Sequence, residues 1–172
     1  MHIGSGVEYG LHCLLPLVGR EAPASARDLA EFQGVSPSYL AKLFTRLQKA
    51  GLVAAVEGVE GGFRLARAPQ EISVLDVVEA LDEGKRLFEC REVRRNCVLY
   101  REAPPPAATR GVCGIHAVML EAEAEMRRVL ARHSLADLAA GVAAKLPAEL
   151  MRRGREWFDG RRAARRESDG DD

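Results

Sequence analysis

The residues whose types and spacing could support chemistry in this sequence are four cysteines and one glutamate–histidine pair. The cysteines are Cys13, Cys90, Cys97 and Cys113. No export signal is visible, so we expect a cytoplasmic protein, in which clustered cysteines bind metals or undergo redox chemistry more often than they form disulfides. The alternative is that some of them are small buried hydrophobic residues, and we expect this of Cys13.

Glu8 and His12 are four residues apart in a segment with helical spacing, so their side chains would lie on one face, one turn apart. Such a pair could bind one metal ion or one iron of a cluster. Cys90 and Cys113 could add two thiolates, and Cys113 directly precedes a predicted helix whose dipole favours the thiolate. One carboxylate, one imidazole and two thiolates are four ligands, the number that a 2Fe-2S cluster requires. Zinc is the chemical alternative, because it also accepts Cys and His ligands.

Two further residues lie close to these in the sequence. His116 follows Cys113 at a C-x-x-H spacing, so it could replace a helix ligand or donate a hydrogen bond to one. Tyr9 is the neighbour of Glu8, and it would lie beside the metal or pack as an ordinary aromatic residue. No Ser-His-Asp arrangement, phosphate-binding glycine loop or metalloprotease motif occurs, so the sequence predicts no enzyme.

The elements that must position these residues begin with helices and one hairpin. Apolar spacing and capping residues predict helices over residues 7–19, from Ser25 to about Gln33, and from Ser36 to Gly51. Ser25 and Asp28 form a predicted capping box. Two short apolar segments, 52–56 and 63–66, flank a glycine-rich turn and predict a hairpin. Three helices and a hairpin in this order predict a winged helix-turn-helix.

The remainder of the sequence predicts a second part and a tail. A fourth helix is capped by Ser73 and stopped by Gly84, and a long loop of about residues 87–112 follows. Helices are predicted over 115–130, with an apolar stripe, and over 135–146, after a capping box of Ser134 and Asp137. The arginine-rich segment after Pro147 is expected to be frayed. We expect three regions: 1–67 for DNA binding, 68–146 for the metal and dimerisation, and 147–172 as the tail.

The evidence for nucleic-acid binding is local, because 25 basic and 25 acidic residues give no net charge. The third predicted helix holds three basic residues and no acidic one. Residues expected at base edges are Ser36, Ser38 and Tyr39, and those expected at phosphates are Lys42, Arg46, Lys49 and Arg64. The alternative is a solvated basic face. In the hairpin turn, Glu57 and Glu60 repel phosphates, and Arg64 and Arg67 are the nearby attractive charges.

Several segments of the sequence resemble one known family, the small winged-helix regulators of the IscR, NsrR and RsrR type. The similar segments are VSPSYLAKLF at 35–44, AGLV at 50–53, EGGFRL at 60–65 and LDVVEA at 75–80, followed by a cysteine-bearing loop and a long helix. The resemblance covers about residues 3–140. It implies a dimeric transcription regulator, mainly α with a small β-hairpin wing and a long dimerisation helix, which binds double-stranded operator DNA and no membrane.

The resemblance also implies an iron-sulfur cluster whose state controls the affinity for DNA. Usual members have three closely spaced cysteines, whereas here six residues separate Cys90 from Cys97 and fifteen separate Cys97 from Cys113. Glu8, His12, Cys90 and Cys113 match the mixed ligands of the RsrR branch, in which the helix pair comes from the partner chain. Cys97 then becomes a spare thiol or an alternative ligand, and Tyr9 a redox-coupled neighbour.

We therefore expect a 2Fe-2S cluster, with a 4Fe-4S cluster or zinc as alternatives. The expected function is redox-responsive transcription regulation. Alternative functions are a zinc-stabilised or metal-free regulator that responds to a partner, and an electron-transfer or cluster-carrier protein.

Overall fold

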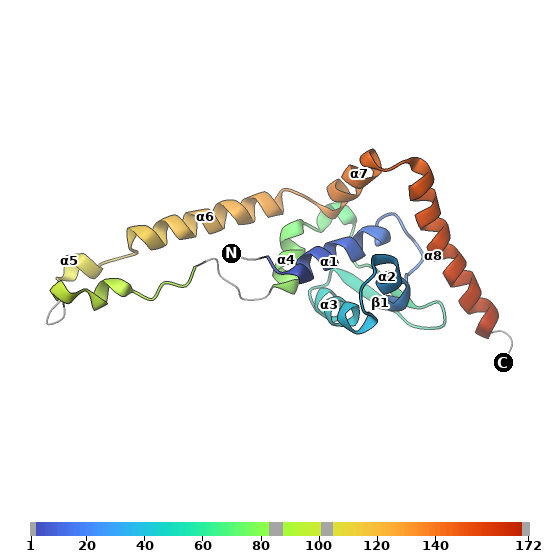
Figure 1. Ribbon diagram of the computed structural model, residues 1–172, viewed down its shortest axis with the longest axis horizontal. Coiled ribbons are helices and arrows are strands. Elements are labelled where there is room, and N and C mark those ends of the chain that lie inside the picture. The colour runs from blue at the N-terminus through green and yellow to red at the C-terminus, as the bar shows by residue number, and fades with distance from the viewer. Residues whose placement is uncertain (1–2, 83–87, 101–104, 170–172) are drawn as a thin grey trace. The chain divides into compact units, whose positions relative to one another are not determined.

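The computed structural model describes residues 3–82, 88–100 and 105–169, which are divided between two compact units (Figure 1). The larger unit contains residues 3–82 and 130–169, and the smaller unit contains the described residues from 88 to 129. The described residues are mainly helical with one two-stranded antiparallel sheet, so the predicted fold class is confirmed. Among these residues, no helix combines the length and the hydropathy that a membrane span needs.

The larger unit begins with three helices in the order that a helix-turn-helix requires. They are α1 (Ser5–Leu14), α2 (Ala26–Gln33) and α3 (Pro37–Lys49). The first is shorter than predicted, because Pro16 cannot donate to the helix ladder and lies in a separate 3-10 helix, η1 (Leu15–Leu17). As predicted, Pro37 opens α3 and the Ser36 hydroxyl caps it by accepting the backbone N–H of Tyr39 at 3.2 Å.

Only one half of the capping box predicted for α2 forms. The Ser25 hydroxyl accepts the backbone N–H of Asp28 at 3.0 Å. The Asp28 carboxylate does not return to the cap and instead accepts a hydrogen bond from Arg165 in the C-terminal helix. The side chain of Asp28 is only 4% exposed, and a buried carboxylate needs an opposite charge more than an uncharged backbone donor.

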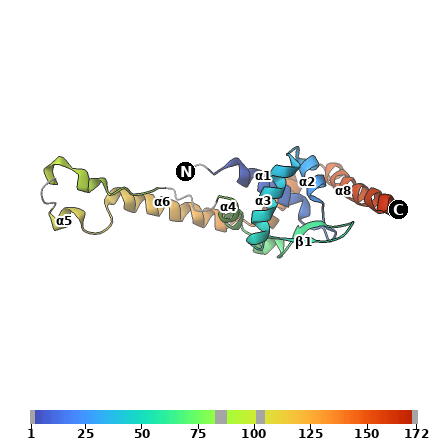
Figure 2. The same ribbon diagram turned by 90° about the horizontal axis from the view of Figure 1, so that it is seen from below.

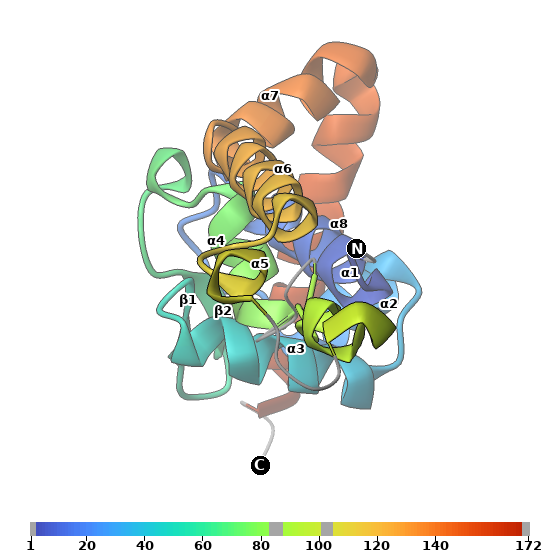
Figure 3. The same ribbon diagram turned by 90° about the vertical axis from the view of Figure 1, so that its left-hand side faces the viewer.

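The predicted hairpin forms the wing. Strands β1 (Val53–Val56) and β2 (Gly62–Leu65) pair antiparallel with Val53 opposite Leu65, and Figure 3 shows them beside α3. Phe63 attaches the hairpin to the chain before α2, because Phe63 and Ala24 exchange backbone hydrogen bonds of 2.8 and 3.0 Å. The Phe63 ring also packs on Phe44 of α3 with centroids 4.9 Å apart. The wing is therefore fixed to both helices of the helix-turn-helix.

Two capped helices close the larger unit, after a short 3-10 helix, η2 (Pro69–Glu71). Helix α4 (Val74–Leu81) has a capping box of Ser73 and Asp76, and α7 (Leu135–Lys145) has the predicted box of Ser134 and Asp137. Two backbone hydrogen bonds of 2.8 Å join the N-termini of these helices: the N–H of Val74 donates to the His133 carbonyl, and the N–H of Leu135 donates to the Ile72 carbonyl. The predicted stop of α4 at Gly84 lies outside the described residues. The largest fully buried side chains include Leu14, Leu29, Leu40, Phe44, Leu47 and Ile72.

The smaller unit carries three of the four cysteines. It contains the 3-10 helices η3 (Val93–Asn96) and η4 (Val98–Tyr100), the short α5 (Pro106–Thr109) and most of α6 (Gly114–Ala131). Helix α6 confirms the long helix predicted over 115–130. None of its 18 residues, all of which are described, is buried within this chain.

After Pro147 the chain forms α8 (Ala148–Asp169), which differs from the frayed tail that the sequence predicts. Phe158 is buried in the core of the larger unit, with its ring 4.8 Å from that of Phe32 in α2. Trp157 packs on the same ring at 5.3 Å. Burial of these aromatic side chains gives α8 the tertiary packing on which most helices depend. The acidic end of the tail at residues 170–172 lies outside the described residues.

Candidate functional site

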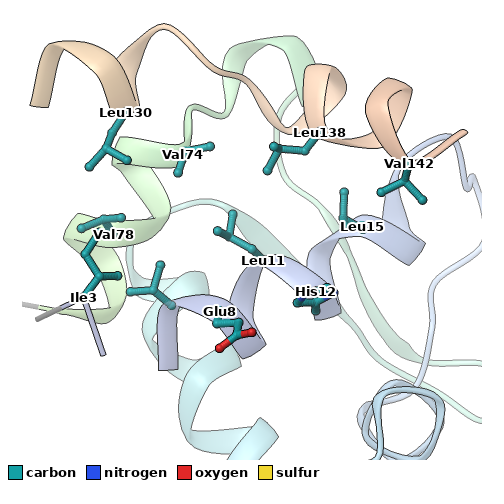
Figure 4. Close-up of a pocket in the computed structure, with 11 residues that line it drawn as sticks. Ile3, Glu8, Leu11, His12, Leu15, Val74, Val78, Leu130, Leu138 and Val142 are labelled. Carbon is teal, nitrogen blue, oxygen red and sulfur yellow. The ribbon is translucent and has the colours of Figure 1, made fainter. Parts of the chain in front are cut away.

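Glu8 and His12 lie one turn apart on α1, as the spacing predicts, and both line an open groove of about 410 Å³. Figure 4 shows them on one helix, while the other lining side chains are aliphatic and come from α1, from Ile3 and Leu15 on either side of it, and from α4, α6 and α7. A carboxylate and an imidazole at the edge of an apolar groove have few competing polar neighbours. The pair is therefore accessible and chemically suited to bind a metal.

Cys90 and Cys113 belong to the smaller unit, where one arginine is close to both. Cys90 is exposed and Cys113 is half-buried before the first turn of α6. The backbone N–H of His116 donates to the Cys113 sulfur at 3.3 Å, which is the contact expected of a thiol at a helix N-terminus. The pKa of Arg94 is raised, first by its hydrogen bond to the Glu92 carboxylate and further by its coulombic interactions with Glu92, Cys113 and Cys90.

Arg94 connects the two cysteine-bearing segments, a role that no sequence pattern predicts. Its guanidinium binds the Glu92 carboxylate at 2.5 and 2.8 Å and donates to the Gly111 carbonyl at 2.9 Å. The same hydrogen bond holds the pKa of Glu92 below its ordinary value. Glu92 has a φ of 49°, a backbone conformation that non-glycine residues rarely adopt, and its bidentate pair with Arg94 compensates. No local sequence signal marks Arg94, because its carbonyl partner is 17 residues away.

The other sequence-predicted ligands have different surroundings. Cys97 is half-buried at the end of η3, and its backbone N–H donates to the Arg94 carbonyl at 3.3 Å. His116 stacks near Phe88 with centroids 5.8 Å apart. Cys13 is fully buried, and burial raises the pKa of its thiol to about 12, so the predicted core position is confirmed.

The described residues of a single chain do not bring three or more His, Cys, Asp or Glu side chains together as a metal site. Glu8 and His12 lie one turn apart on α1 of the larger unit, and Cys90 and Cys113 both belong to the smaller unit. Each pair contains the donor types that iron accepts in a 2Fe-2S cluster, thiolate in one and carboxylate with imidazole in the other.

The predicted DNA-facing side of α3 is exposed. Ser38 and Lys42 are solvent-accessible, as are Lys49 of α3 and Arg64 of β2. Tyr39 is half-buried because its ring meets that of Tyr9 edge-on, with centroids 5.7 Å apart and an interplanar angle of 87°. This contact joins α1, next to Glu8, to the helix expected to read DNA.

Two residues predicted to contact DNA already have partners in the protein. The Ser36 hydroxyl caps α3, and it also lies 3.4 Å from the Ser38 hydroxyl. Arg46 donates to the Leu81 carbonyl at 3.0 Å and so stabilises the end of α4. A substitution of Arg46 would therefore change the packing of α4 as well as any phosphate contact. The exposed Lys42 is the better test of phosphate binding by α3.

The wing differs from the electrostatic picture that the sequence predicts. Glu60, expected to repel phosphates, accepts hydrogen bonds from Arg162 of α8 at 2.5 and 2.8 Å and also pairs with Arg166. Figure 2 shows the loop between the strands extending toward α8. The repulsive charge of Glu60 is therefore compensated by residues 102 or more positions away, a compensation that local sequence patterns could not indicate.

Comparison with known proteins places this architecture in one family. The protein rrf2 of Nitratidesulfovibrio vulgaris is 37% identical over 140 residues, which cover 80% of this chain and 87% of that protein. The regulator IscR of Aliivibrio salmonicida is 41% identical over 92 residues, 52% of this chain and about half (55%) of that protein. The solved structure of T. potens IscR superposes with a TM-score of 0.63 at 28% identity, covering 86% of this chain and 93% of that one.

The family profile described as iron-dependent transcriptional regulator, Rrf2, matches residues 3–141. The relatives IscR and NsrR are named as transcriptional regulators, not as enzymes. Residues 142–172, which include α8, lie beyond the match. The chain belongs to the Rrf2 family of transcriptional regulators.

Proposed function

We propose that this protein is a redox-responsive regulator whose 2Fe-2S cluster controls its affinity for operator DNA. The observation that carries the proposal is the carboxylate and imidazole of Glu8 and His12, one turn apart on α1 at the edge of an apolar groove, in a chain whose smaller unit holds Cys90 and Cys113. When bound, a 2Fe-2S cluster supplies a centre that gains or loses one electron. The proposed ligands are Glu8, His12, Cys90 and Cys113, with Cys97 and His116 as alternatives.

The proposed ligands come from two chains of a homodimer. Helix α6 supports this assembly, because Ile115 is 69% exposed and Val118 is 61% exposed, and large uncovered apolar side chains at helical spacing mark interfaces. In the proposed dimer, α6 of each chain covers that of its partner. The cysteines of one chain then meet Glu8 and His12 of the other.

The proposed route to DNA runs through α1. Glu8 is the anionic residue of the helix pair, so its bond to the metal should respond most to a change in charge. Tyr9 follows Glu8, and its ring touches Tyr39 at the start of α3. A displacement of α1 therefore reaches the residues proposed to read base edges, Ser38 and Tyr39, while Lys42 and Arg64 hold phosphates.

Protein purified without oxygen tests the cluster directly, through its visible absorption and its iron and sulfide content. We expect the wild type to be coloured and the Cys90→Ala and Cys113→Ala variants to be colourless. Cys97→Ala is the matched control, because it removes a half-buried thiol from the same unit, and it should retain the colour. If Cys97→Ala is colourless and Glu8→Ala is coloured, the ligands are three cysteines and the proposed set is wrong. A colourless wild type that contains zinc would overturn the proposal of a cluster.

A further inference from the structure

Helix α8 is anchored to the helix-turn-helix by apolar contacts as well as by charge. Phe158 is only 3% exposed and packs on Phe32 of α2. Arg20 lies over the Phe158 ring, 4.9 Å from its centroid, and donates to Asp159 at 2.9 Å. These contacts hold the middle of α8 against α2, so the arginines in the following turns have a defined place.

Four arginines follow this anchor, and each meets a carboxylate of the helix-turn-helix or the wing. The pairs are Arg161 with Glu31, Arg165 with Asp28, and both Arg162 and Arg166 with Glu60. Two of these acids belong to α2 and one to the wing turn. The four arginines and the three acids together carry one net positive charge. Without α8, the same three acids would give this surface three negative charges.

Arg166 is the most exposed of the four, with 63% of its side chain accessible, and it shares Glu60 with the less exposed Arg162. The wing of a winged helix lies along the DNA backbone, and a guanidinium fits phosphate well. Because Arg162 alone can neutralise Glu60, Arg166 is available to bind a phosphate.

We propose that α8 completes the DNA-binding surface: Arg162 neutralises the wing acid Glu60, and Arg166 contacts a backbone phosphate beside the wing. This inference rests on the proposed DNA binding, but not on the cluster. It assigns a function to a segment outside the part of the chain that matches the family.

Binding of full-length protein to a labelled random-sequence duplex of about 30 base pairs tests the proposed phosphate contact of Arg166, because phosphate contacts do not depend on sequence. Anisotropy titrations over a series of salt concentrations compare the wild type with Arg166→Gln. The matched control is Arg152→Gln, which removes the same charge from the same helix where the arginine pairs within α8, with Glu149 and Glu156. Circular dichroism checks that both variants are folded.

We expect Arg166→Gln to weaken binding at least about fivefold. It should also lower the salt slope of log affinity by about one unit for each phosphate that the protein no longer neutralises. Arg152→Gln should leave the affinity and the salt slope near those of the wild type. In a Glu60→Gln background, Arg166→Gln should still lower the slope, because the phosphate contact does not require the acid. If the wild type binds DNA and Arg166→Gln has the same affinity and salt slope as Arg152→Gln, the proposed role of α8 is wrong, while DNA binding by the protein still stands. No binding by the wild type at the lowest salt would overturn DNA binding itself.

Discussion

Replacing Gly62 with alanine should detach the wing from the helix-turn-helix. A Cβ atom at this position would lie 2.3 Å from the carbonyl oxygen of Ala24 and 2.8 Å from the backbone nitrogen of Ser25. Both atoms belong to the main chain, so neither can rotate away as the end of a side chain could. The φ of Gly62 is 152°, which L-residues rarely adopt. The substituted chain must therefore separate β2 from the segment before α2.

The magnitude follows from what this separation removes. Ala24 and Phe63 exchange two backbone hydrogen bonds, of 3.0 and 2.8 Å, and each contributes about 1 kcal/mol net. An alanine held at an unfavourable φ costs about 1–3 kcal/mol more. We expect Gly62→Ala to lower the free energy of unfolding by about 3–5 kcal/mol, a large part of the stability of an ordinary domain.

Urea unfolding followed by circular dichroism measures this decrease and compares it with that of a second glycine of positive φ, Gly51. Gly51 has a φ of 68°, and a Cβ atom added there would have no neighbour within 4 Å, so Gly51→Ala should cost about 1 kcal/mol from backbone strain alone. The difference between the two variants reports the contact with Ala24 together with the less favourable φ of Gly62. Equal decreases in Gly62→Ala and Gly51→Ala would refute the reasoning, because the clash would then have no energetic consequence.

Three other predictions concern the core, the dimer and DNA. Burial raises the pKa of Cys13 from 9.0 to about 12, so the thiol ionises at a lower pH in the unfolded chain than in the folded one. The free energy of unfolding should therefore fall as pH rises from 9 toward 12. A Cys13→Ala variant that shows the same fall would contradict this prediction. Light scattering should find a dimer, and Ile115→Asp with Val118→Asp should yield a monomer, whereas a monomeric wild type would defeat the proposed assembly. Lys42→Ala should lower the salt slope by about one unit for each phosphate it leaves unneutralised, and an unchanged slope would place α3 away from phosphates.

The parts of the fold that the sequence predicts are those determined by neighbours along the chain. Ser36 and Pro37 define the start of α3, and Ser134 with Asp137 defines the start of α7, because a cap is formed by residues within one turn. The hairpin is equally local, since its strands are separated by a short glycine-containing turn. The cap at Ser25 forms only in part, because its acid, Asp28, has a distant partner.

The sequence does not predict α8, because its stability depends on residues far away in the chain. Its arginines read as a solvated charged segment until Glu60 and Asp28 are placed beside them, 102 and 137 residues earlier. Trp157 and Phe158 show no helical stripe of their own and become an anchor only against Phe32. Arg94 is missed for the same reason: it joins segments that local patterns do not relate.

For the candidate site, the spacing predicts that Glu8 and His12 share a helix face, and the structure has both on one edge of a groove. Residue types alone also predict Cys90 and Cys113 as ligands, which stays a prediction, and they do not mark Arg94. Their assembly into one site with Glu8 and His12 depends on a second chain, and it stays a proposal.

The affinity of one protein preparation for one operator duplex, measured with the cluster oxidised, reduced by dithionite and removed, tests the central claim most directly. We predict that the oxidised protein binds at least about tenfold more tightly than the reduced one, a coupling of about 1.4 kcal/mol that lies within the usual allosteric range. The contact between Tyr9 and Tyr39 gives the coupling a physical route from α1 to α3. Equal affinities in all three states would contradict the account and make any bound cluster structural.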